Sequence, residues 1–151
     1  MNAKMKAPFG VLGISAGDGF LKEILFLPEE ESLLPPSDPF AERICLELEA
    51  YLSDPDFRFD IPLMPAGTAF QKRVWKEISE ISRGKTLEYG EIAKILSSSP
   101  RAVGQACGSN PIPIVIPCHR VVSKSGLGGF MHRGEGYPLS IKKWLLSHES
   151  D

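Results

Sequence analysis

Cysteine and histidine are scarce in this sequence of 151 residues, which contains three of each. Cys45, Cys107 and Cys118 cannot all pair with one another, and their spacing matches no common zinc-binding pattern. We therefore expect free thiols, as in the reducing cytoplasm, and predict neither a disulfide framework nor a bound metal.

Long apolar segments are also missing. No apolar run approaches the ~20 residues that span a bilayer as a helix, and residues 1–10 lack the apolar core of a signal peptide. The glycines between Ser123 and Gly136 do not form the glycine–lysine pattern of a phosphate-binding loop. These absences exclude a helical membrane protein and argue against a nucleotide cradle, so we expect a cytoplasmic protein without a membrane partner.

Neither positive nor negative residues predominate, since the net charge of the chain is only -2. Its distribution is more informative. Residues 1–60 hold 5 Lys and Arg against 12 Asp and Glu, a balance of -7, whereas residues 61–151 hold 12 against 7, a balance of +5. The basic second half modestly favours contact with a polyanion such as nucleic acid.

Proline and glycine divide the chain into two parts. Pro62, Pro65 and Gly67 are typical of a linker between domains. We therefore expect a small α/β domain over residues 1–61 and a second domain over residues 62–151.

The first domain is predicted to contain strands and one helix. Apolar runs at residues 9–15 and 20–27, joined by a glycine-containing turn, predict a β-hairpin. Asp38 and the proline after it are typical of a helix N-terminus, and the helix should end near residue 53. Residues 57–59 favour a further short strand.

The second domain is predicted to be mainly helical. Helical spacing and capping residues predict helices that begin near Thr68, Glu91, Arg101 and Ser140. The two middle helices are short and separated by a few turn residues, which resembles a helix-turn-helix. Ala102, Gly104 and Ala106 would allow close approach to DNA or, equally, close packing between helices, and spacing alone leaves both interpretations open.

One segment has a composition that packing alone does not explain. Cys118 and His119 lie between the apolar β-branched runs 114–116 and 121–122, which favour buried strands. Pro117 cannot donate to a strand ladder, so the chain should break just before the cysteine. A thiol beside an ionisable ring suits nucleophilic chemistry. A lone cysteine is more commonly an inert core residue, and this segment by itself leaves both interpretations open.

Several segments together resemble one protein family. Residues 108–122 (GSNPIPIVIPCHRVV) resemble the active-site signature of the O6-alkylguanine-DNA alkyltransferases, also called methylated-DNA–protein-cysteine methyltransferases. Further resemblances follow in the family's order, at residues 67–75, 86–93, 101–104 and 143–149. The resemblance covers residues 61–149. It implies an α/β (α+β) fold, with a small ribonuclease-H-like strand–helix domain followed by a mainly helical domain that carries a winged-helix-like helix-turn-helix.

The resemblance implies direct-reversal DNA repair. The alkyl group of O6-alkylguanine in DNA, with O4-alkylthymine as a second candidate substrate, would pass irreversibly to Cys118 in a single turnover without a cofactor. His119, acting through a water, would take the thiol proton, and Glu149 would orient His119. Tyr89 would donate a proton to the departing guanine, and Asn110 would hold the turn before the active site.

The implied partner is double-stranded DNA containing O6-alkylguanine, bound in the minor groove by a monomer. The base must leave the stack, because a sulfur atom cannot reach the alkyl carbon in line inside a duplex. Tyr89 would crowd a backbone phosphate, and Arg101 would replace the extruded base. Ala102, Gly104 and Ser125 would lie against the DNA.

The substrate loop departs from the family pattern, because Phe130 stands where the family usually has a tyrosine. Phe130 and Met131 are expected to contact the alkylated base, whereas residues 131–136 are hard to align. An alternative from another functional class is a non-enzymatic protein that binds or senses alkyl lesions in DNA. Relatives of that kind lack the cysteine, so Cys118 argues for alkyl transfer.

Overall fold

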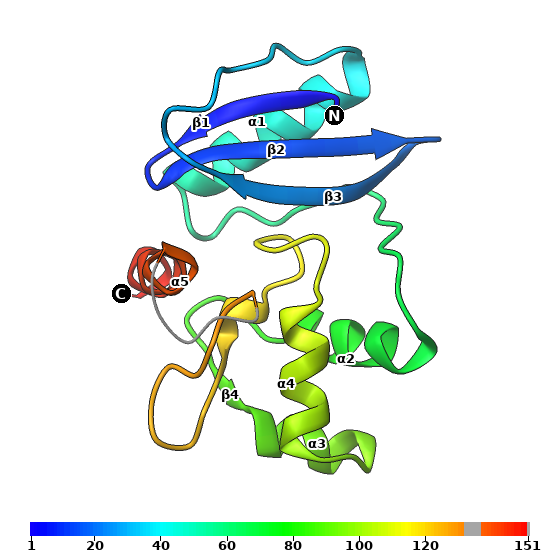
Figure 1. Cartoon of the computed structure of the whole chain (residues 1–151), viewed down its shortest axis with the longest axis vertical. Coiled ribbons are helices and arrows are strands. Elements are labelled where there is room, and N and C mark those ends of the chain that lie inside the picture. Colours follow the sequence, from blue (N-terminus) through cyan, green and yellow to red (C-terminus); the bar gives the residue numbers. More distant parts are fainter. Residues whose placement is uncertain (132–136, 151) are drawn as a thin grey trace. The chain divides into compact units, whose positions relative to one another are not determined.

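The computed structural model describes residues 1–131 and 137–150, and the chain divides into two compact units, Met1–Ala66 and Gly67–Asp151 (Figure 1). This division falls a few residues after the boundary that the linker prolines favoured. The fold mixes α-helices with small β-sheets. No helix within the described ranges is long and apolar enough to cross a membrane.

The first unit is built on an antiparallel sheet with the strand order β1-β2-β3. The strands are β1 (Ala3–Ala7), β2 (Gly10–Gly17) and β3 (Phe20–Leu27). β2 and β3 form the predicted hairpin, in which Ile14 lies opposite Ile24. Asp18 and Gly19 close its turn with positive φ angles of 55° and 79°. β1 extends this sheet by a strand that the sequence analysis did not predict.

Helix α1 (Pro39–Ser53) covers one face of this sheet (Figure 1). Its N-terminus lies where it was predicted, since the Asp38 side chain accepts a hydrogen bond from the Ala41 amide at 2.8 Å. Ile44 and Leu48 on α1 are fully buried, and so is Leu12 on β2. Burial of these apolar side chains holds the helix on the sheet.

The strand expected at residues 57–59 does not form. Phe57 and Phe59 instead pack edge to face, with ring centroids 5.6 Å apart, and Phe59 lies 5.5 Å from the ring of Tyr51 on α1. Aromatic packing against the helix therefore explains the apolar pattern that favoured a strand.

The second unit is mainly helical. Its elements are α2 (Ala69–Ser79), β4 (Leu87–Glu88), α3 (Tyr89–Leu96), α4 (Pro100–Gly108), the 3₁₀ turn η1 (Cys118–Arg120), β5 (Val121–Val122) and α5 (Tyr137–Glu149). β4 and β5 pair in parallel. Trp75 on α2 donates its indole N–H to the carbonyl of Ala106 on α4 at 2.8 Å, which fixes these two helices to each other.

Helix α2 begins with the predicted capping box. The Thr68 hydroxyl accepts from the Gln71 amide at 3.1 Å, and the Gln71 side chain accepts from the Thr68 amide at 2.9 Å. These bonds satisfy two amides that a helix N-terminus would otherwise leave unpaired.

Helices α3 and α4 are short and joined by a tight turn, as predicted. Ser97 ends α3 in the left-handed region with φ 54°. Ser99 then caps α4 by accepting from the Ala102 amide at 3.1 Å. Ala106 is buried, whereas Ala102 and Gly104 are half-buried. Helix packing therefore accounts for Ala106, and the other two small residues remain partly accessible.

Candidate active site around Cys118

The chain reaches Cys118 through a compact buried turn and not through the strand predicted at residues 114–116. Ile112, Ile114 and Ile116 are buried, as the apolar pattern indicated. However, the Ile116 amide donates to the Ile112 carbonyl at 2.9 Å, and Ile114 adopts φ 75°. A positive φ is incompatible with extended backbone, so the apolar side chains pack around a turn. Of the two runs that favoured strands, only the second contains one, the short β5.

Asn110 organises this turn with a single buried side chain. Its Oδ1 accepts from the Ile112 amide at 2.9 Å, and its Nδ2 donates to the Ile116 carbonyl at 2.9 Å. The same Nδ2 lies 3.1 Å from the Cys118 sulfur and donates to it. Asn110 therefore fixes the turn and at the same time places a hydrogen-bond donor on the candidate nucleophile.

His119 is fully buried and held at one edge of its ring. Its Nε2 lies 2.9 Å from Oε2 of Glu149, the last residue of α5, and the Glu149 side chain is itself only 2% exposed. The Arg83 guanidinium donates to the backbone carbonyl of Glu149 at 2.8 Å. The end of α5 is thus tied to the segment after α2, and the carboxylate is directed at the ring.

The other ring nitrogen of His119, Nδ1, is buried and has no hydrogen-bond partner within the part of the chain that the structure describes. Burial lowers the pKa of His119, and the hydrogen bond of its Nε2 to Glu149 opposes this change without reversing it. The ring is therefore neutral at neutral pH. With the Nε2 proton donated to Glu149, Nδ1 carries a free lone pair and can accept a proton.

The Cys118 sulfur lies at the wall of a pocket of about 240 Å³. The pocket is lined by Tyr89, Gly104, Cys107, Gly108, Cys118, Gly129, Phe130 and Met131. Burial raises the pKa of the Cys118 thiol to about 11, and the hydrogen bond from Asn110 and the positive charge of Lys142 oppose this rise. The thiol is therefore protonated at neutral pH, and it needs a base before it can act as a nucleophile.

Tyr89 stands at the start of α3 and faces the same pocket. Its hydroxyl donates to the Gly129 carbonyl at 3.4 Å. Gly128 has φ 73°, and a Cβ atom there would lie 2.8 Å from the Tyr89 ring. The loop therefore approaches the ring more closely than any side chain would allow. Burial raises the pKa of Tyr89 to about 12, so its hydroxyl keeps its proton at neutral pH.

The remaining predicted site residues fall into two groups. Phe130 is buried and Met131 half-buried, and both line the pocket, while their contact with an alkylated base stays a prediction. Arg101, at the start of α4, and Ser125 are exposed and lie outside the pocket lining. Most of the hard-to-align segment, residues 132–136, lies outside the described residues.

Sequence reasoning missed Lys142, which is fully buried on α5 and donates to the carbonyls of Leu127 and Gly129. A lysine followed by a second lysine is usually read as part of an exposed face. A signal was present, because Lys142, Leu145 and Glu149 recur at helical spacing, and Leu145 marks that face as buried. Arg120 and Cys107 were also not proposed, although Arg120 binds Glu149 and Cys107 lines the pocket.

A thiol that faces a pocket, with an amide donor on its sulfur and a neutral histidine beside it, defines a protein that acts through a cysteine nucleophile. The family model of the 6-O-methylguanine DNA methyltransferase DNA-binding domain matches residues 69–151. The methylated-DNA–protein-cysteine methyltransferase of Methanosarcina mazei is 38% identical, over 97% of this chain and 95% of its own length. The chain therefore belongs to the 6-O-methylguanine DNA methyltransferase family.

Solved structures agree with this assignment. The Mycobacterium tuberculosis O6-methylguanine methyltransferase matches with a TM-score of 0.80 and 35% identity, over 98% of this chain and 92% of that one. The M. tuberculosis OGT in complex with DNA matches with a TM-score of 0.78 and 35% identity, over 97% and 90% of the two chains. The similarity thus extends over both units of this chain.

Proposed function

We propose that this protein repairs DNA by direct reversal, as a methylated-DNA–protein-cysteine S-methyltransferase. It transfers the alkyl group of O6-alkylguanine to Cys118, irreversibly and once per molecule, and O4-alkylthymine is a second candidate substrate. The observation that carries the proposal is the position of the Cys118 sulfur, at the wall of a pocket and 3.1 Å from Asn110 Nδ2. The relatives supply the substrate class, since they are named for methylated DNA and for a cysteine acceptor.

The thiol proton leaves toward His119. Nδ1 of this residue is buried without a hydrogen-bond partner in the described part of the chain, and it can accept a proton. A water molecule between Nδ1 and the Cys118 sulfur would satisfy both groups and relay the proton. Glu149 orients the ring through Nε2 and stabilises the imidazolium that forms. His119 is thus the general base, and Glu149 is its positioning residue.

The Cys118 sulfur then attacks the alkyl carbon in line with its bond to guanine O6. The carbon–sulfur bond forms as the carbon–oxygen bond breaks, and the electron pair of the broken bond leaves with guanine. The Tyr89 hydroxyl gives guanine a proton, and the proton held by His119 is returned to Tyr89 through solvent. The thiol hydrogen therefore ends on guanine. The thioether on Cys118 is a poor leaving group, so the protein is consumed.

DNA binding is assigned to the α3–turn–α4 segment, as a helix-turn-helix whose second helix enters the minor groove. Arg101 is exposed at the start of α4 and would take the place of the extruded base. Ala102 and Gly104 are small and half-buried, so backbone can approach DNA there, and exposed Ser125 would add a contact from the loop. Tyr89 would crowd a phosphate and favour extrusion of the nucleotide.

We also infer the architecture that these roles imply. The three-stranded antiparallel sheet with its covering helix supports a ribonuclease-H-like domain in the unit Met1–Ala66. The short helices α3 and α4 with the β4–β5 pair support a winged-helix-like motif in the unit Gly67–Asp151. The residues that line the pocket all belong to the unit Gly67–Asp151, which supports a reaction site contained in this unit.

The proposal is tested by intact mass after incubation with duplex DNA that contains one O6-methylguanine. Transfer of a methyl group should add about 14 Da to the protein, and peptide mapping should place it on Cys118. Cys118→Ala should take up no methyl group. The matched control is Cys107→Ala, which removes a second thiol from the same pocket lining and should still accept the methyl group. Lesion-selective binding without any mass gain would instead establish the alternative, a protein that senses alkyl lesions.

A further inference from the structure

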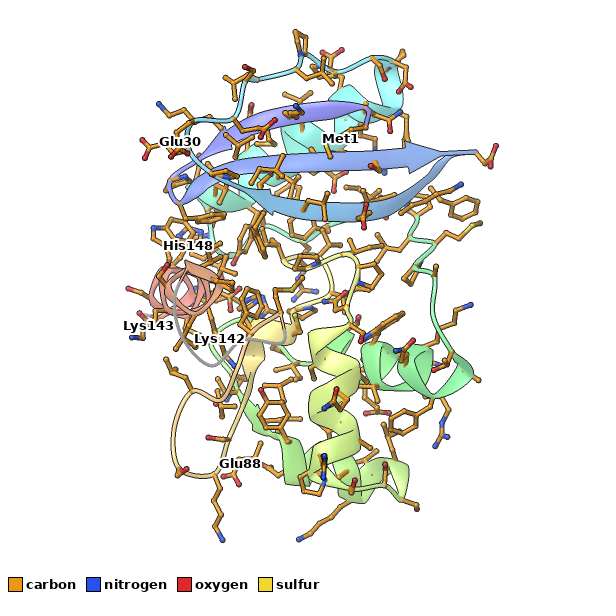
Figure 2. All side chains as sticks on the ribbon, in the orientation of Figure 1. Met1, Glu30, Glu88, Lys142, Lys143 and His148 are labelled. Carbon is orange, nitrogen blue, oxygen red and sulfur yellow. The ribbon has the colours of Figure 1, made fainter. Side chains whose placement is uncertain are left out.

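Lys142 is a fully buried lysine on α5, whereas the next residue, Lys143, is exposed. Figure 2 shows these two lysines on different sides of the helix. Complete burial of an ammonium group is rare, because the charge loses its hydration. Such a residue persists only where the fold supplies hydrogen-bond acceptors for it.

Three backbone carbonyls supply these acceptors. Lys142 Nζ donates to the carbonyls of Val121 at 2.7 Å, Leu127 at 2.5 Å and Gly129 at 2.9 Å. An ammonium group has three N–H donors, so this arrangement uses all of them. Val121 belongs to β5, while Leu127 and Gly129 lie just before Phe130 and Met131, and residues 127–131 are called the substrate loop. Lys142 therefore fixes the loop to the strand that directly follows the nucleophile turn.

The segment fixed by Lys142 forms one wall of the pocket. Gly129, Phe130 and Met131 line the pocket together with Cys118. The Gly129 carbonyl accepts from both Lys142 and the Tyr89 hydroxyl. Lys142 Nζ also lies 6.0 Å from the centroid of the Tyr89 ring. The position of the ammonium thus determines where the loop and the proposed proton donor sit relative to each other.

The ammonium also carries charge into a site where negative charge must develop. The titratable groups that face it are Tyr89 on α3, Cys107 on α4, and Cys118 and His119 on η1. Burial lowers the pKa of Lys142 to about 8, and the two cysteines oppose this change. Lys142 is therefore still mainly protonated at neutral pH. The charge of Lys142 lowers the pKa of Cys118 and so opposes the effect of burial on that thiol. It also lowers the pKa of His119, where burial acts in the same direction.

We propose that Lys142 is a positioning residue for alkyl transfer, which holds the substrate loop in its pocket-forming shape and balances the charge of the Cys118 thiolate. The inference rests on the proposed function, because it assigns the charge balance to the reaction at Cys118. It gives α5 two contributions to the site, Glu149 toward His119 and Lys142 toward the loop and the sulfur.

Lys142→Met removes the charge and the donors while keeping a long side chain, and Lys142→Arg keeps the charge. Lys143→Met, one residue away on the exposed side, is the matched control. Two rates are measured for each protein: single-turnover methyl transfer at saturating lesion DNA, and alkylation of Cys118 by iodoacetamide as a function of pH, followed by peptide mass. DNA affinity is measured separately.

Lys142→Met should slow methyl transfer by about tenfold or more, while its DNA affinity stays within about threefold of the parent protein. At about pH 7 its alkylation of Cys118 should slow by about tenfold, because an opposite charge near a thiolate lowers the pKa of the thiol by about one unit. The difference should shrink above about pH 8, where Lys142 of the parent protein loses its charge. Lys142→Arg keeps the charge and should retain the parent rate of Cys118 alkylation at neutral pH, and Lys143→Met should match the parent protein in every measurement.

An unchanged transfer rate in Lys142→Met would overturn the inference, and so would slowed transfer with unchanged alkylation of Cys118 at neutral pH, which would reduce Lys142 to a purely structural role. If Lys142→Met does not fold, Lys142→Arg decides, because slower alkylation of Cys118 at neutral pH in this charge-conserving variant would contradict charge balance. Failure of the parent protein to transfer methyl groups would instead refute the proposed function. The iodoacetamide series does not depend on lesion transfer, so the two failures are distinguishable.

Discussion

Arg120 donates two parallel hydrogen bonds to the carboxylate of Glu149, one from Nε to Oε1 at 2.9 Å and one from a terminal nitrogen to Oε2 at 2.8 Å. The same Oε2 lies 2.9 Å from His119 Nε2. A carboxylate at the C-terminus of a helix is unfavourable to the helix dipole. Glu149 is stable there because it is shared between a permanent cation and the imidazole that we propose as the base.

Removing the cation from this network should cost both stability and activity. Arg120→Met leaves Glu149 as a buried carboxylate without its strongest partner, a change that typically costs about 3–5 kcal/mol. Methyl transfer should slow by about tenfold or more, because the base loses its oriented partner. Arg83→Met is the control, since Arg83 donates to the backbone carbonyl of Glu149, not to its carboxylate, and should affect the rate much less. Denaturant unfolding and single-turnover kinetics check both effects; equal rates in the two variants would contradict the role given to the carboxylate.

Asn110 should be sensitive to replacement by its nearest isostere. Asn110→Asp keeps an acceptor for the Ile112 amide but loses the donor to Ile116 and to the Cys118 sulfur. The new anion would also raise the pKa of the Cys118 thiol. We expect a loss of stability of about 1–3 kcal/mol from the unpaired buried carbonyl, and slower alkylation of Cys118 by iodoacetamide.

The control for Asn110 is Asn2→Asp in the first unit. The Asn2 side chain accepts a hydrogen bond from the Ala16 amide at 2.8 Å, and an aspartate can accept the same bond. This variant should leave both the stability and the reactivity of Cys118 close to the parent values. A similar loss in both variants would show that the donor role of Asn110 is unimportant.

Gly128→Ala should disturb the substrate loop and little else. The residue has φ 73°, and an added Cβ would lie 2.8 Å from the Tyr89 ring, so both backbone strain and a clash oppose alanine. Methyl transfer should slow by about tenfold or more as the loop and Tyr89 move apart. The control is Gly126→Ala in the same loop, where the nearest atom to a Cβ is the Ser123 hydroxyl at 4.0 Å. Transfer at the parent rate by Gly128→Ala would show that the close approach has no function.

Local patterns were sufficient where local chemistry determines the structure. The capping box at Thr68, the N-cap at Asp38 and the hairpin turn at Asp18 all rest on neighbouring residues, and the structure confirms them. β1 was missed although residues 3–7 alternate between small or apolar residues and lysine, and the buried positions alternate in the same way. Alanine and lysine are weak strand formers, so the alternation of small or apolar residues with lysine was the only signal for this strand.

The candidate site depended more on long-range contacts. An apolar run such as residues 114–116 predicts burial equally well for a strand or a turn, and only the bonds made by Asn110 decide between them. The burial of Lys142 follows from carbonyls that lie 13 to 21 residues away in the sequence. Helical spacing marked the face of Lys142 as buried, but no local pattern encodes which carbonyls it contacts. Cys118 and His119 could be proposed as a reactive pair only when the other motifs of the family resemblance were added to their own segment.

The free energy of unfolding should decrease at acid pH because His119 is buried. Burial lowers its pKa in the folded protein, opposed by Glu149, while an unfolded histidine titrates near 6.5. As the pH falls through about 6.5, the unfolded chain therefore binds a proton that the folded chain refuses, and the free energy of unfolding decreases until the folded pKa is passed. Urea unfolding at about pH 8 and about pH 5.5 should show this decrease in the parent protein.

His119→Gln keeps an amide donor for Glu149 but cannot titrate, so part of the decrease should disappear. The control is His148→Gln, because His148 also lies on α5 but is half-exposed. This variant should retain the decrease in the free energy of unfolding. An identical pH dependence in the parent protein and His119→Gln would mean that the ring is not held neutral in the fold, and the assignment of His119 as the base would lose its physical support.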